Sequence, residues 1–239
     1  MRVLLAAPTS NHKDYCFDDW CKMVRNLSYP NLDILLVDNS ADESYYNKIL
    51  EAGILCFRVP PEGAPPQFIA KCQNCIRDYF LAGQYDFLFS LETDVFVPKN
   101  IIEYMIGFQL PMLNISYHVT QRDKDTMCIQ GMTKTGKSNR LKLLGYNEAF
   151  DLYDGEIKQL NSMSIGEEFQ VTGTGIGCSL IRSDILEQQG FRVDAKKGLA
   201  VFSDSYFHLD LQRAGITDML DTTIVVEHRR QDWKNLKFN

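Results

Sequence analysis

The chain has 239 residues, 45% of them hydrophobic, and a formal net charge of −6 at neutral pH. This length suits a single α/β domain with one substantial core. Because acidic and basic residues are mixed along the chain, the acidic balance disfavours broad electrostatic binding to nucleic acids or anionic membranes.

Strands and helices alternate through residues 1–110. The expected strands are RVLLAAPT (2–9), LDILLVDNS (32–40), ILCFRVP (54–60) and YDFLFSLETDVF (85–96), and the expected helices are DYCFDDWCKMVRNL (14–27), ADESYYNKILEAG (41–53) and PPQFIAKCQNCIRDYFLAG (65–83). In the expected helices, apolar residues recur at helical spacing, and in the expected strands they form compact runs. Strands joined to helices by short connections predict a parallel sheet covered on both faces.

After Leu110 the pattern loosens into short expected strands with charged and glycine-containing turns. GTGIGCSLIRSDILEQQGF (173–191) then predicts a glycine-rich turn, a short strand and a helix. FSDSYFHLDLQRAGI (202–216) predicts an amphipathic helix that Gly215 ends, and TTIVVEH (222–228) predicts a last strand. No linker divides the chain, so we expect one domain over 1–239.

The cysteines and the apolar runs both favour an intracellular protein. No run approaches the roughly 20 apolar residues of a membrane helix, and RVLLAAP is too short for a signal peptide. We therefore expect no membrane span and a cytoplasmic location. The cysteines number seven, without regular spacing, which is typical of a reducing compartment. Cys72 and Cys75 form a C-x-x-C pair, but no second ligand pair follows, so we interpret them as core thiols.

Polar residues collect where the expected strands end. They are Pro8 and Thr9, Asp38 and Asn39, Glu92 and Asp94, and His228. In open α/β sheets, ligands bind outside the carboxyl ends of the strands. Residues i and i+2 of a strand face the same side, about 7 Å apart, so two acids there would repel unless a cation or a proton lies between them. The alternative is that Asp94 caps the helix that follows Pro98 while Glu92 is solvated.

Six segments in sequence order carry a resemblance to a known family. They are VDNS (37–40), AKCQNCIRDYF (70–80), LFSLETDVFVP (88–98), the 173–191 block, SDSYFHLDLQRAGI (203–216) and VVEH (225–228). Together they resemble the GT-A type of nucleotide-sugar-dependent glycosyltransferase, most closely the broad inverting family-2 group. The resemblance spans nearly the whole chain and is weakest between about Leu110 and Phe169. It implies a Rossmann-like mixed, mostly parallel sheet, with a nucleotide-binding half (1–110) and an acceptor-binding and catalytic half (111–239).

The resemblance also implies roles for individual residues. Glu92 and Asp94 match the acid-x-acid motif that holds Mn²⁺ or Mg²⁺ against the donor diphosphate, and His228 matches the histidine that completes the metal site. The residues implied for the nucleotide-sugar donor are Pro8, Thr9, Asp38 (nucleobase edge), Asn39, Lys71, Asn74, Arg77, Thr93, Gly173, Thr174, Gly175 and Arg229. The first acid of the motif is Glu here, where the family more often has Asp.

Asp204 matches the second residue of the family's Glu-Asp pair and is the expected catalytic base. Ser203 replaces the first acid, and both residues also suit ordinary capping of the helix that starts there. The implied reaction is a single displacement that moves a sugar to an acceptor hydroxyl, and the donor that the resemblance implies is UDP-linked. The acceptor stays open among a glycan, a protein side chain, a lipid-linked sugar and a modified base, and the sequence predicts no oligomeric state.

A second motif competes with this interpretation. GMTKTGKS (131–138) fits the phosphate-binding pattern G-x-x-x-x-G-K-[ST], in which Lys137 and Ser138 would bind phosphate and Mg²⁺. The flanking DKDTMCIQ is charged and short, and no following helix of adequate length is expected. We keep two alternatives open: a nucleotide-dependent phosphotransferase that uses this loop, and a sugar-nucleotide-binding module without catalysis.

Overall fold

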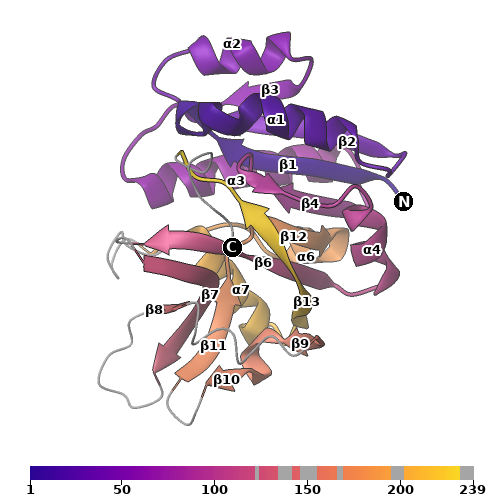
Figure 1. Cartoon of the computed structure of the whole chain (residues 1–239), viewed down its shortest axis with the longest axis vertical. Helices are drawn as coiled ribbons and strands as arrows, with labels where there is room; N and C mark the ends of the chain where they lie inside the picture. The colour runs from indigo at the N-terminus through magenta and orange to yellow at the C-terminus, as the bar shows by residue number, and fades with distance from the viewer. Residues whose placement is uncertain (122–123, 134–141, 146–154, 166–168, 195–201, 232–239) are drawn as a thin grey trace.

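The computed structural model describes residues 1–231 apart from 122–123, 134–141, 146–154, 166–168 and 195–201 (Figure 1). Its strands are β1 (Val3–Thr9), β2 (Leu32–Asp38), β3 (Leu55–Arg58), β4 (Phe87–Leu91), β5 (Val95–Phe96), β6 (Met112–Gln121), β7 (Lys124–Thr133), β8 (Lys142–Gly145), β9 (Ile157–Gln159), β10 (Ser164–Ile165), β11 (Phe169–Thr174), β12 (Cys178–Arg182) and β13 (Asp218–His228). Its helices are α1 (Asp14–Arg25), α2 (Ser44–Glu51), α3 (Pro65–Ala82), α4 (Ile101–Gly107), α6 (Ser183–Gln188) and α7 (Ser203–Arg213), with short 3₁₀ turns η1 (Asn11–Lys13) and η2 (Leu160–Ser162).

The described strands form one mixed sheet. β3, β2, β1 and β4 lie side by side and parallel, as the alternation of strands and helices predicts. β12 then pairs antiparallel with both β4 and β6, and β6 pairs parallel with β13. Beyond them β7, β11 and β10 add antiparallel strands. The expected α/β sheet flanked by helices is confirmed.

Alternating side chains of each strand pack into two apolar layers. In β1, Val3 and Leu5 face one layer while Leu4 and Ala6 face the other, as the period of two in a strand requires. The first layer takes side chains from α1, α2 and α4, and the second from α3, α6 and α7. Burying one large apolar side chain stabilises the fold by roughly 1.5–3 kcal/mol, so these layers hold the strand ends in place.

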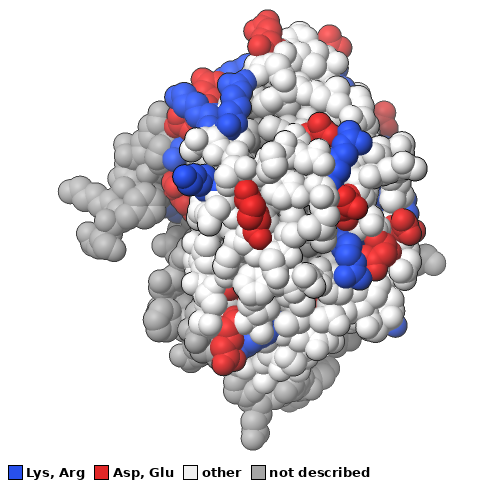
Figure 2. Space-filling model, turned by 90° about the vertical axis from the view of Figure 1, so that its right-hand side faces the viewer, with Lys and Arg blue, Asp and Glu red and all other residues white. Residues whose placement is uncertain are grey.

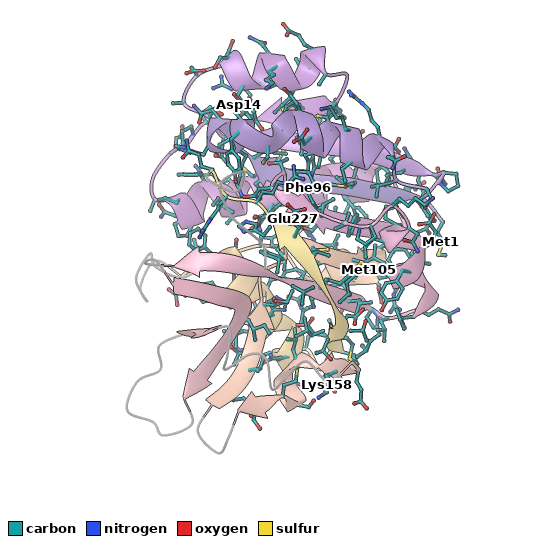
Figure 3. All side chains as sticks on the ribbon, viewed as in Figure 1. Met1, Asp14, Phe96, Met105, Lys158 and Glu227 are labelled. Atoms are coloured by element: carbon teal, nitrogen blue, oxygen red, sulfur yellow. The ribbon has the colours of Figure 1, made fainter. Side chains whose placement is uncertain are left out.

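The expected fourth strand is two strands with a turn between them. β4 ends at Leu91, and the N–H of Val95 donates to the carbonyl of Glu92 over 3.0 Å. β5 then leaves the central ladder and pairs with β13, where Phe96 lies opposite Glu227 (Figure 3). The two acids therefore lie in a turn, and the i, i+2 argument from strand geometry is wrong.

The strands after Leu110 are longer than expected. β6 and β7 have 10 residues each. β6 pairs with β12 and β13 near its start and with β7 near its end. Because its neighbours change along its length, its side chains face different surroundings and show no single alternation. β13 likewise begins at Asp218 and not at Thr222, and its register shifts between Asp221 and Val226.

Charged side chains of both signs are interspersed on the face that Figure 2 shows. This agrees with the mixed charges of the sequence. Within the part of the chain that the structure describes, no helix combines the length and apolar character that crossing a membrane needs.

Candidate active site

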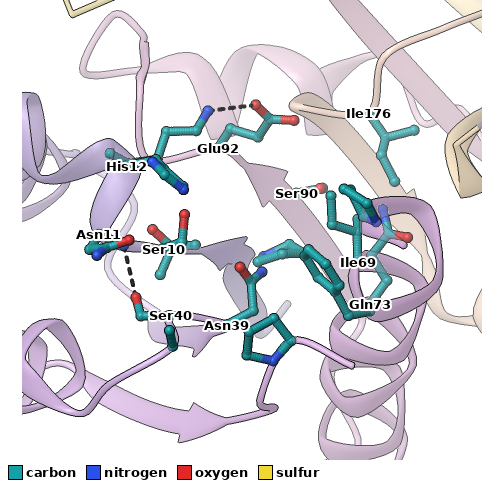
Figure 4. A pocket seen from close by; sticks show the side chains of 17 residues that line it. Ser10, Asn11, His12, Asn39, Ser40, Ile69, Gln73, Ser90, Glu92 and Ile176 are labelled. Carbon is teal, nitrogen blue, oxygen red and sulfur yellow. Dashed lines mark hydrogen bonds and ion pairs between the residues drawn. The ribbon is translucent and has the colours of Figure 1, made fainter. Parts of the chain in front are cut away.

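A cavity of about 640 Å³ opens at the carboxyl ends of β1, β2 and β4 (Figure 4). The loop after β1, with η1, forms one wall, and Asn39 and Ser40 after β2 form a second. The first three turns of α3 contribute Phe68, Ile69 and Gln73, and Glu92 closes the end beyond β4. Three strand ends that lie far apart in the sequence thus meet at one site, as expected for an open α/β sheet.

Buried hydrogen bonds fix the two loops of this cavity. The N–H of Asn11 donates to the hydroxyl oxygen of Ser40 over 2.8 Å. Ser40 donates to Asp38 Oδ1 from its hydroxyl (2.5 Å) and from its N–H (3.1 Å). Asp38 is fully buried, and Arg58 Nε lies 3.6 Å from its other oxygen. The carboxylate expected to read a nucleobase therefore lies behind the wall, which Asn39 and Ser40 form.

Glu92, Asp94 and His228 converge beside the cavity. One ligand atom from each lies within 4.8 Å of those of the other two. The antiparallel pairing of β5 and β13 sets His228 opposite Val95. The N–H of Arg229 also donates to the carbonyl of Asp94 over 2.8 Å. Tertiary pairing, in addition to the turn, therefore assembles this acidic cluster.

A lysine that sequence reasoning missed lies in the acidic cluster. The ammonium of Lys13 pairs with Asp94 Oδ2 and lies 3.4 Å from Glu92 Oε2, and His228 Nε2 lies 3.2 Å from the same Asp94 oxygen. Burial alone would raise the pKa of the Asp94 carboxyl, but Lys13 and His228 outweigh it and lower that pKa to about 2. Asp94 is therefore ionised at neutral pH. The position of Lys13 just beyond a strand end is the signal that would have found it.

The acidic cluster fits a divalent ion. Two carboxylates and an imidazole are a donor set that Mn²⁺ accepts. Asp94 is only 3% exposed, and its Oδ1 has no hydrogen-bond partner among the described residues. A buried carboxylate oxygen without a partner is costly, and a bound cation would satisfy it. These are the three residues that the sequence predicts for the metal.

A second cavity of about 230 Å³ adjoins the first. The residues that line both cavities are Ile69, Gln73, Glu92 and Ile176. Asp204 lines the second cavity together with Phe202, Tyr117 and His228. The structure thus brings the expected base to the same space as Glu92 and His228, two of the three expected metal ligands.

The start of α7 places Asp204 without using it as the helix cap. The N-cap residue is Phe202, whose side chain makes no capping hydrogen bond. Ser203 instead donates its hydroxyl to the amide oxygen of Gln73 on α3. Asp204 accepts the N–H of Ser205 over 2.8 Å. The capping alternative therefore does not describe Ser203, and α7 is tied to the wall of the first cavity.

Of the other residues expected at the donor, some line the first cavity and others do not. Pro8, Thr9 and Asn39 line the first cavity. Thr93 is fully buried and shares a hydrogen bond of 2.8 Å with the hydroxyl of Thr9, so it joins β1 to the turn. The guanidinium of Arg229 pairs with Asp19 and Glu227.

The polar residues of α3 are engaged elsewhere. Lys71 pairs with Glu62 at the surface. Asn74 exchanges hydrogen bonds with the backbone of Phe191 (2.6 and 3.0 Å), and Arg77 donates to carbonyls at the end of α6. These contacts join α3 to the following segments, and the cavity is lined instead by Phe68, Ile69 and Gln73, which sequence reasoning did not select.

The glycine block packs against α7. A Cβ at Gly173 would lie 2.7 Å from His208 Cδ2, and the carbonyl of Thr174 accepts a hydrogen bond of 2.8 Å from His208 Nε2. Gly175 is buried. Only Ile176 of this stretch lines the cavities.

The remaining motifs are partly described. Gly131–Thr133, the first residues of the phosphate-loop pattern, belong to β7 and pair with β11, whereas Lys137 and Ser138 lie outside the described residues. A strand at the first glycine does not match a phosphate-binding loop. Cys72 is buried in the core, as expected, and Cys75 is partly buried.

Neither a family model nor a curated protein matches this sequence. Solved structures do match its fold. TarS 1–349 of S. aureus in complex with UDP has a TM-score of 0.58 at 10% identity, covering 95% of this chain and 60% of that one. The same protein with UDP-GlcNAc gives 0.58 at 10%, covering 100% and 62%. Mannosyltransferase PcManGT of Pyrobaculum calidifontis, in complex with GDP-Man and Mn²⁺, gives 0.57 at 12%, covering 95% and 56%.

These likenesses establish the fold. The chain has the GT-A fold, as the resemblance in the sequence predicts. It spans about 60% of the length of the solved chains that it matches. Because one fold hosts many activities, the activity is argued from the site.

Proposed function

We propose that this chain is a metal-dependent glycosyltransferase that moves a sugar from a nucleotide-sugar donor to an acceptor hydroxyl. The observation that carries the proposal is the position of the acidic cluster. Glu92 lines both cavities, and His228 lines the smaller one together with Asp204. We take the donor to be UDP-linked, because the TarS structures hold UDP and UDP-GlcNAc.

The nucleotide would occupy the larger cavity, between the loops after β1 and β2 and the start of α3. Asn39 and Ser40 offer polar groups there, and Phe68 and Ile69 offer an apolar wall, a mixture that suits a nucleoside. Its diphosphate would then point toward Glu92 and the rest of the acidic cluster. A divalent ion held there supplies charge stabilisation to the departing diphosphate.

Asp204 would act on the acceptor in the smaller cavity. Its carboxylate takes the proton of the acceptor hydroxyl as the oxygen bonds to the anomeric carbon of the sugar. The bond from that carbon to the phosphate oxygen breaks, and its electron pair leaves with the diphosphate. A single displacement of this kind inverts the anomeric centre. Phe202 and Tyr117 border the acceptor, which is specified here only as a group that presents a hydroxyl.

A thermal-shift panel of UDP- and GDP-linked sugars, with and without Mn²⁺, tests this proposal. A ligand that binds only the folded chain raises its melting temperature, so we expect a rise with Mn²⁺ and the matching donor together. The panel is repeated with Asp94→Asn, which should lose the rise. The matched control is Asp184→Asn. Asp184, on α6, pairs with Arg182 at the end of β12 and lines neither cavity. A rise in melting temperature with ATP alone, or the lack of a rise with every nucleotide sugar, would refute the proposal.

A further inference from the structure

The side chain of Lys13 occupies the place where a divalent ion would bind. Its ammonium contacts both carboxylates of the acidic cluster and shares Asp94 Oδ2 with His228. The side chain is 28% exposed and also lines the larger cavity. Lys13 therefore lies between the acidic cluster and the space assigned to the donor.

The charges of the acidic cluster make Lys13 a competitor of the metal. The ammonium offsets one of the two carboxylate charges. A divalent ion on the same oxygens would face that ammonium at close range, and like charges so placed repel. The ammonium must then leave Asp94, and the nearest open space is the larger cavity.

The backbone of Lys13 restricts where the ammonium goes. Lys13 ends η1, and its N–H donates to the carbonyl of Ser10 over 2.9 Å. Its own carbonyl accepts from the thiol of Cys16. With both backbone groups held, the movement falls to the flexible four-carbon side chain, which can turn from the acidic cluster into the cavity that it already lines.

We propose that Lys13 is a diphosphate-binding residue that Glu92 and Asp94 hold in reserve until a divalent ion takes its place. The ion releases the ammonium, and the ammonium then binds the diphosphate of the donor. Metal and donor consequently promote each other's binding, since each affects the position of the same side chain. This inference rests on the proposed function. It assigns to Lys13 the coupling between metal binding and donor binding.

The test measures binding and needs no turnover. Mn²⁺ is titrated by electron paramagnetic resonance into the wild-type chain and Lys13→Met, with and without saturating UDP, and UDP is titrated by calorimetry at saturating Mn²⁺. Without nucleotide, we expect Lys13→Met to bind Mn²⁺ roughly tenfold more tightly, in the usual range of coupling between sites. At saturating Mn²⁺, it should bind UDP roughly tenfold more weakly.

Two controls separate the role of Lys13 from general charge and from folding. Lys22→Met removes the same charge from an exposed pair with Asp19 and should leave both affinities within about twofold. Should Lys13→Met fail to fold, Lys13→Gln provides the same measurement with a polar side chain. Inorganic diphosphate in place of UDP should show the same dependence on Lys13, because the ammonium contacts phosphate and not the base.

The outcomes distinguish the two proposals. Unchanged Mn²⁺ affinity in Lys13→Met, or unchanged UDP affinity, overturns the inference about Lys13. A wild-type chain that binds Mn²⁺ but neither UDP nor inorganic diphosphate overturns the coupling as well as the proposed donor. Tighter Mn²⁺ binding and weaker diphosphate binding in Lys13→Met, with no transfer from any nucleotide sugar, would uphold Lys13 and refute only the glycosyltransferase.

Discussion

The two halves of the chain bury polar groups in different places. In residues 1–110 the buried polar side chains stand at or near the strand ends and the cavity wall: Thr9, Asp38, Ser40, Gln73, Ser90, Thr93 and Asp94. Between them the interior is apolar. In the second half, buried polar groups form a chain through the interior itself, beneath α7.

That chain is continuous. Ser179 donates to the amide oxygen of Asn114 (2.6 Å), and Asn114 donates to Asp218 (2.8 Å). Asp218 lies 2.6 Å from His208 Nδ1, and His208 Nε2 lies 2.8 Å from the carbonyl oxygen of Thr174. Both ring nitrogens of His208 thus face oxygen atoms of acceptor groups, an arrangement that favours the protonated imidazolium.

The contrast shows how each half positions its part of the site. Apolar packing sets the strand ends that form the larger cavity. A buried ion pair sets the helix that carries Asp204, because His208 joins α7 to β13 and β11 and lies one helical turn beyond Asp204. Substitutions in the two halves should therefore affect different properties of the protein.

The largest expected effect is a loss of transfer rate without a loss of UDP affinity. Asp204→Asn removes the proposed base and should lower the rate of transfer by about 10²–10⁴-fold. UDP affinity at saturating Mn²⁺ should stay within about twofold of the wild type, since Asp204 lines only the smaller cavity. Steady-state kinetics and calorimetry measure the two quantities. Asp210→Asn, on the same helix, is the control, and near-normal transfer by Asp204→Asn would show that another group is the base.

The next effect concerns stability. Asp218→Asn leaves the buried imidazolium of His208 without its counter-ion and should lower the free energy of unfolding by about 3–5 kcal/mol. Asp33→Asn breaks an exposed pair with Arg2 in the first half and should cost about 1 kcal/mol or less. Urea denaturation compares them. Equal costs would remove the distinction between a half held by packing and a half held by a buried ion pair.

The same pair predicts a pH dependence. Burial alone would lower the pKa of His208, but the charge of Asp218, with a smaller contribution from Asp204, outweighs it and raises that pKa. A raised pKa in the folded state stabilises fully below the unfolded value of about 6.5 and is lost as pH rises through the folded value. The difference in unfolding free energy between the wild type and His208→Gln should thus shrink between pH 6 and pH 9, by up to about 1.4 kcal/mol per unit. A difference that grows with pH would mean that His208 is neutral.

The smallest expected effect is on UDP affinity and concerns α3 in the first half of the chain. Lys71→Ala removes an ammonium that pairs with Glu62 at the surface, so UDP affinity should change by less than about twofold. Gln73→Ala, on the same helix but in the cavity wall, is the comparison and should weaken UDP binding more. A larger loss in Lys71→Ala would place Lys71 at the donor.

Much of the first half could be predicted because its contacts are local. Each strand of residues 1–96 except β5 has a compact apolar run, and its parallel neighbours follow from short helical connections. The second half could be predicted less well. β6 changes partners along its length, and no pattern in the sequence indicates that the polar residues Asn114, Asp218 and His208 meet in the interior.

By itself, the sequence predicted an α/β sheet and the strand ends where a site should form, because periodicity and chain order limit how parallel strands can be arranged. Its resemblance to a known family implied the GT-A fold. It also brought Glu92, Asp94, His228 and Asp204 forward as candidates. Only the tertiary structure decided which groups meet. It placed Asp38 and Thr93 behind the wall, engaged Lys71, Asn74 and Arg77 elsewhere, and set Lys13 between the two acids. The physical reason is that charge and hydrogen-bond partners depend on distances of a few ångströms between segments that the sequence keeps far apart.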